Sequence, residues 1–162
     1  PFLTWGYTTV IVSLAIWFLL YKTGDYHWHF LWFSIVAIGW PLSIISRNKK
    51  RNGVTTYIDR VVGKIWLVFA IGVILCSMMA FFVLKMPILF LVLLLISMAV
   101  TLTGFVIKFN IAVGFGIFGV LASFLFLFIA GTTQILLFAA VFFVMMVIPG
   151  HILNYLTKKE NV

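Results

Sequence analysis

A chain of 162 residues that is 65% hydrophobic and only 9% charged does not match a soluble domain, in which about a quarter of the residues are charged. The net charge of +8 does not indicate nucleic-acid binding, because the basic residues stand at the ends of apolar runs, where they face lipid headgroups. The single cysteine, Cys76, lies inside an apolar run, which is typical of a small packing residue. The composition therefore predicts an all-α integral membrane protein.

Six apolar stretches are long enough to cross a bilayer, which needs about 20 residues for roughly 30 Å of hydrocarbon. They cover approximately residues 4–21, 28–46, 65–84, 88–107, 111–130 and 135–155. We therefore expect one transmembrane domain over residues 1–162, built as a bundle of six helices.

The basic loop 47–64, between the second and third spans, predicts the orientation of the chain. It holds six of the eleven basic residues: Arg47, Lys49, Lys50, Arg51, Arg60 and Lys64. Positively charged loops stay on the cytoplasmic side. With both termini inside, nine basic residues are cytoplasmic, since Lys108, Lys158 and Lys159 join the six, and only Lys22 and Lys85 are outside. We predict this orientation.

The second half of the loop has a helical pattern. A possible helix start at Thr56 is followed by an apolar face that includes Ile58, Val61 and Ile65. This predicts a short amphipathic helix at the headgroups before the third span. The six basic residues are either an anchor that only sets the topology or a contact surface for a soluble partner or anionic headgroups.

Small and hydroxylated residues follow one face of the fourth and fifth spans. On the fourth they are Ser97, Thr101 and Gly104, in a stripe that ends at the basic Lys108, and on the fifth they are the pairs Ala112-xxx-Gly116 and Gly119-xxx-Ser123. Such residues let helices approach closely in lipid. The fifth span is expected to pack tightly, within the bundle or across a dimer. The stripe on the fourth is either a packing seam or the wall of a polar pathway.

Two prolines, Pro41 and Pro149, lie near the inner ends of the second and sixth spans. Proline removes a backbone donor, so Pro149-Gly150 should loosen the sixth helix. We predict that the inner ends of the second, fourth and sixth helices converge on a pocket for an anionic headgroup or a small polar ligand. Its lining residues would be Ser43, Lys108, His151 and Asn154.

The one candidate metal site consists of Asp25, His27 and His29 on the outer side, which supply oxygen and nitrogen ligands. Asp25 as a helix cap beside histidines of an aromatic belt is the favoured interpretation, because no further residue completes a tetrahedral site. No cofactor is indicated. No Asp or Glu falls within a predicted span, and the common catalytic motifs are absent, so we do not expect an enzyme.

Four segments, residues 3–9, 39–42, 53–60 and 145–154, resemble a group of small multi-pass bacterial inner-membrane proteins without assigned activity. The resemblance implies a location in the bacterial inner membrane and no mechanism. From the residues, we expect a non-enzymatic scaffold or partner-binding module that acts alone, as a homo-oligomer or as the partner of another membrane protein. The alternative is a small transporter or channel subunit with a polar cleft between the second, fourth and sixth helices.

Overall fold

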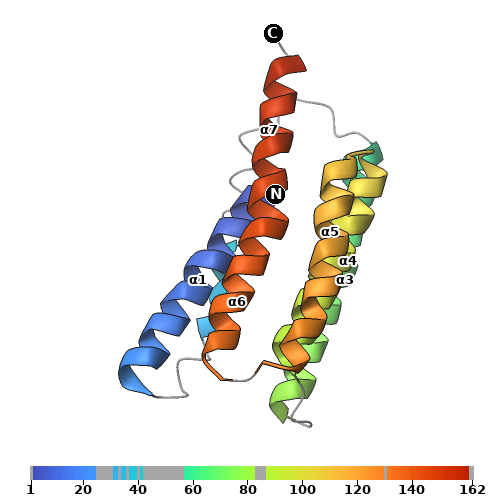
Figure 1. Cartoon of the computed structure of the whole chain (residues 1–162). Coiled ribbons are helices and arrows are strands. Elements are labelled where there is room, and N and C mark those ends of the chain that lie inside the picture. Colours follow the sequence, from blue (N-terminus) through green and yellow to red (C-terminus); the bar gives the residue numbers. More distant parts are fainter. Residues whose placement is uncertain are drawn as a thin grey trace. The chain divides into compact units, whose positions relative to one another are not determined.

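The computed structural model describes residues 2–24, 57–82, 87–129 and 131–160, together with residues 31, 32, 34, 35, 37–39 and 41. Every element in this part of the chain is a helix, and no strand occurs in it (Figure 1). The elements are α1 (Phe2–Thr23), α3 (Tyr57–Phe82), α4 (Ile88–Val106), α5 (Asn110–Ser123), the 3-10 helix η2 (Phe124–Leu127), α6 (Thr133–Phe142), the π-helix η3 (Phe143–Val147) and α7 (Ile148–Glu160). The predicted all-α class is confirmed.

Five helical stretches among the described residues are long and apolar enough to cross a membrane: Leu3–Thr23, Tyr57–Ala80, Ile88–Val106, Asn110–Leu127 and Thr133–Leu156. They coincide with five of the six predicted spans. The described residues between 31 and 41 are helical, but most of the second predicted span lies outside the described residues. That span stays a prediction.

Helix α3 corrects the predicted start of the third span. The helix begins at Tyr57, eight residues before the predicted start at Ile65, and continues without a break to Phe82. Its 26 residues extend over roughly 39 Å, more than the hydrocarbon thickness of about 30 Å. The helix start indicated at Thr56 is confirmed to within one residue, but the expected amphipathic helix is not separate from the span. The polar first turns, which carry Arg60 and Lys64, belong to the spanning helix itself.

The chain divides into two compact units, one formed by Pro1–Val54 with Gly131–Val162 and the other by Thr55–Ala130. In the second unit α4 packs antiparallel against α5 (Figure 1). A Cβ atom at Gly104 would lie 2.8 Å from Val113 Cγ2, and one at Gly116 would lie 2.8 Å from the backbone nitrogen of Thr101. The tight packing predicted for the fifth span is confirmed, and its partner is α4.

In the first unit α1 packs antiparallel against α6, η3 and α7. The buried face of α1 consists of Gly6, Thr8, Thr9, Val12, Ser13, Ile16 and Leu20. Opposite it lie large apolar side chains, among them Phe138, Phe142 and Met145, which are at most 2% exposed. The Trp32 ring meets Phe138 edge to face, with 5.4 Å between the ring centroids.

Candidate functional site

The last membrane helix changes its winding just before Pro149. Proline has no N–H group, and its ring clashes with the carbonyl four residues earlier in an α-helix. The chain forms a π-helix over Phe143–Val147, in which the N–H of Ile148 donates to the carbonyl of Phe143, five residues back. A wider turn before the proline relieves that clash. The helix is thus disturbed, as predicted, but it continues through the buried Pro149 and Gly150 into α7.

Glycine at position 6 lets α1 approach this π-helix. A Cβ atom there would lie 3.0 Å from Val147 Cγ2 and 3.2 Å from Met146 Cβ. Met146 and Val147 are each only 1% exposed, so the wider turn fills the space that the glycine leaves. The two helices are therefore fitted to each other at this point.

One turn beyond the π-helix, a polar contact joins the two ends of the chain. The Tyr7 hydroxyl lies 2.6 Å from Nε2 of His151, and either group can donate, depending on the histidine tautomer. The two rings meet edge to face with 5.9 Å between their centroids. The sequence pattern indicated His151 but not Tyr7, because the two residues are 144 positions apart and share no local pattern.

The four predicted pocket residues are distributed over different parts of the chain. His151 and Asn154 are exposed residues of α7, Lys108 belongs to the other unit, and Ser43 lies outside the described residues. Their convergence therefore stays a prediction.

The buried hydroxyl groups of α1 and α4 are bonded within their own helices. In α1, Ser13 donates to the carbonyl of Thr9 at 2.7 Å. In α4, Ser97 donates to Leu93 at 2.6 Å, and Thr101 donates to Ser97 at 2.8 Å. Because these hydroxyls have acceptors, they do not require a polar ligand. At Thr101 and Gly104 the stripe packs against α5, as the close approaches of Gly116 and Val113 show.

The second unit gathers positive charge at one end. Helices α3, α4 and α5 are successive antiparallel neighbours, so the start of α3 and the turn between α4 and α5 lie at the same end (Figure 1). The exposed side chains of Arg60, Lys64 and Lys108 lie there. We call this end of the second unit, with these three residues, the basic end. The other predicted contact residues, Arg47, Lys49, Lys50 and Arg51, lie outside the described residues.

Lys108 occupies a backbone position that glycine usually fills. Its φ is 54°, in the left-handed region. It closes α4 with two hydrogen bonds, from the Phe109 N–H to the Gly104 carbonyl at 2.8 Å and from its own N–H to the Phe105 carbonyl at 3.2 Å. This is the Schellman arrangement. A residue with a Cβ atom is destabilised there by about 1–2 kcal/mol. The chain thus carries a lysine at the basic end despite backbone strain.

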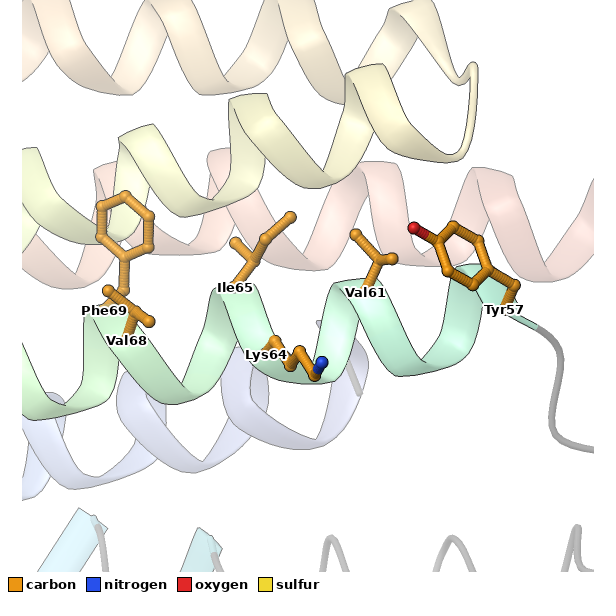
Figure 2. A pocket seen from close by; sticks show the side chains of 6 residues that line it. All are labelled: Tyr57, Val61, Lys64, Ile65, Val68 and Phe69. Carbon is orange, nitrogen blue, oxygen red and sulfur yellow. The ribbon is translucent and has the colours of Figure 1, made fainter.

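A shallow, open groove follows one side of α3 below the basic end. Figure 2 shows the six side chains that line it: Tyr57, Val61, Lys64, Ile65, Val68 and Phe69. Polar groups stand only at the end nearer the start of the helix. The sequence pattern placed Val61 and Ile65 on one face but did not indicate the groove, because the span was expected to begin only at Ile65.

Among the described residues, no three His, Cys, Asp or Glu side chains are close enough to hold a metal ion. The weak candidates Asp25, His27 and His29 lie outside those residues. Comparison of the chain with known protein families, with curated proteins and with solved structures found no match. The resemblance to small bacterial inner-membrane proteins therefore stays a prediction.

Proposed function

We propose that this protein is a non-enzymatic membrane module of the bacterial inner membrane that binds a partner protein through α3 and the preceding basic segment. Both termini, the basic segment before α3 and the first turns of α3, with Arg60 and Lys64, are cytoplasmic in this proposal. The partner contacts α3 within the membrane and the basic residues at its surface.

The distribution of charge within each unit supports the orientation. In the second unit, Arg60, Lys64 and Lys108 share one end. In the first unit, α1 and α7 are antiparallel, so Lys158 and Lys159 at the end of α7 lie at the end where α1 begins, and Lys22 lies at the other. Positive charge favours the cytoplasmic side.

One observation carries the proposal: none of the residues 57–80 of α3 is buried. The other four spans bury between 33% and 56% of their most apolar stretch. The basic start of α3 offers a contact surface in the headgroup region, and its unburied apolar part offers a second one in the hydrocarbon core. A partner protein that contacts both regions gains charge complementarity at the first and helix packing at the second.

The proposal is tested by photocrosslinking in native membranes at native abundance. A photoreactive residue replaces Leu67 on α3, which is 60% exposed, or Leu121 on α5, which is 65% exposed and serves as the matched control. We expect a discrete protein adduct from position 67 only.

The adduct should be lost when four loop residues are neutralised to glutamine: Arg47, Lys49, Lys50 and Arg51. Adducts that form equally at both positions, or that survive neutralisation, would contradict the proposal.

A second candidate function, a small transporter or channel subunit, is favoured by the π-helix in the last span, because such turns often occur at functional sites. This candidate requires a wet cleft along α4. Cysteines introduced by Ser97→Cys and Thr101→Cys, in a background without the native cysteine, test it with a water-soluble thiol reagent. Protection of both positions supports the packed module, and rapid labelling from one side supports transport.

A further inference from the structure

We propose that the groove on α3 binds one anionic glycerophospholipid, with its phosphate at Lys64 and Tyr57 and one acyl chain along Ile65, Val68 and Phe69. The inference rests on the membrane placement proposed above, but it does not require the partner protein.

The polar end of the groove suits a phosphate. Tyr57 and Lys64 are seven positions apart, two turns of an α-helix, and therefore lie on the same side of α3. In Figure 2 the Lys64 side chain lies along the helix with its ammonium nitrogen directed toward the Tyr57 end. A lysine near the end of a span extends in this way toward the headgroups. Both the ammonium and the hydroxyl group are donors that phosphate oxygens accept.

A neighbouring charge strengthens the case for an anion. Arg60 precedes Lys64 by four residues, so the two cations are adjacent on the helix surface and repel each other. An anion that contacts Lys64 reduces this repulsion. A zwitterionic lipid has the same phosphate but brings its own cation, so it should bind less well than an anionic lipid.

The apolar end of the groove suits an acyl chain. From Ile65 to Phe69 the helix rises by roughly 6 Å, so this part of the groove covers the first carbons of an acyl chain in a hydrocarbon leaflet of about 15 Å. Below Lys64 the groove is lined only by aliphatic and aromatic side chains, and Val68 is 63% exposed. The change from polar to apolar along one helix face matches the change along a phospholipid.

The experiment uses the full chain, purified in a mild detergent and freed of lipid, with native mass spectrometry as the readout. The probes are dioleoyl phosphatidylglycerol and dioleoyl phosphatidylcholine. We expect one phosphatidylglycerol to bind preferentially. Lys64→Gln should weaken its binding about tenfold, because it removes a charge-assisted contact, and Lys64→Arg should retain it. Val68→Trp should fill the groove and weaken both lipids.

The matched control is Lys108→Gln, which removes one charge from the same end of the unit outside the groove. It should leave phosphatidylglycerol binding unchanged. An equal loss in both glutamine variants would indicate diffuse attraction and would overturn the site. Equal binding of the two lipids, or displacement of phosphatidylglycerol by excess inorganic phosphate, would also overturn it.

The outcome is separable from that of the proposed function. Loss of the lipid preference with the Leu67 protein adduct retained refutes the lipid site alone. Loss of the Leu67 protein adduct with the lipid preference retained refutes the partner protein alone.

Discussion

The contact between α4 and α5 can be tested with one methyl group. Gly116 and Gly114 are both inside α5, two residues apart, and differ in their surroundings. A Cβ atom at position 116 would meet the Oγ1 atom and the backbone of Thr101, whereas one at position 114 would have no atom within 4 Å. Both substitutions therefore add one methyl group to α5. In Gly116→Ala it meets the backbone of Thr101, and in Gly114→Ala it meets open space.

The expected magnitude follows from these distances. The new Cβ at position 116 would lie 2.8 Å from the nitrogen and 3.0 Å from the Cα of Thr101, against an ordinary contact of about 3.5–4.0 Å. Because a backbone cannot rotate away, the two helices must separate. Overpacking of this kind destabilises by about 1–3 kcal/mol. Both variants gain about 1 kcal/mol of helix propensity. Gly116→Ala should thus be less stable than Gly114→Ala by the packing term, about 1–3 kcal/mol.

The assay is unfolding of the purified protein in mixed micelles with increasing dodecyl sulfate, followed by far-ultraviolet circular dichroism. Gly114→Ala should unfold at or above the wild-type midpoint, and Gly116→Ala clearly below Gly114→Ala. If the two variants unfold at the same midpoint, α4 and α5 do not approach each other at Thr101, and the packing seam is refuted.

Three further predictions concern other parts of the chain. Tyr7→Phe removes the hydroxyl that contacts His151 and should lower the free energy of unfolding by about 1 kcal/mol in the same assay. In a His151→Ala background the same substitution should cause no loss of stability, and an equal loss there would contradict the contact. Lys108→Gly removes the left-handed strain and should stabilise by up to about 1 kcal/mol, and a lower midpoint would contradict the strain argument. In a cysteine-free background, Asn52→Cys should react with an impermeant reagent only from the cytoplasm and Thr133→Cys only from the periplasm; labelling of Asn52→Cys from outside would overturn the orientation.

Five of the helices were predictable because the length of an apolar run is nearly sufficient evidence for a span. The packing of the fifth span was predictable for a related reason. In lipid, apolar side chains do not distinguish helix contacts from lipid contacts, so small residues identify the contact face. Ala112, Gly116, Gly119 and Ser123 are all buried in α5, as their spacing indicates.

A helix start was indicated at Thr56, but this helix was expected to be separate from the third span because Arg60 and Lys64 were taken to mark the end of the apolar run. Helical hydrogen bonding does not stop where the hydrocarbon stops. The long aliphatic stems of these residues allow a helix to continue into the headgroups with the charges in water. Charge therefore shows where the bilayer ends, and the helix end requires a separate signal.

The π-helix and the Tyr7–His151 contact were not predictable because each depends on two segments far apart in the sequence. Pro149 requires a local adjustment, but the sequence alone does not say whether the helix kinks, breaks or widens. Gly6 on α1 favours widening, since its missing Cβ leaves space beside Met146 and Val147. Once the wide turn is seated there, the next turn of α7 presents His151 to Tyr7. The contact between the two segments thus depends on a glycine near one terminus, a proline near the other and the polar pair beside them. Neither segment alone predicts it.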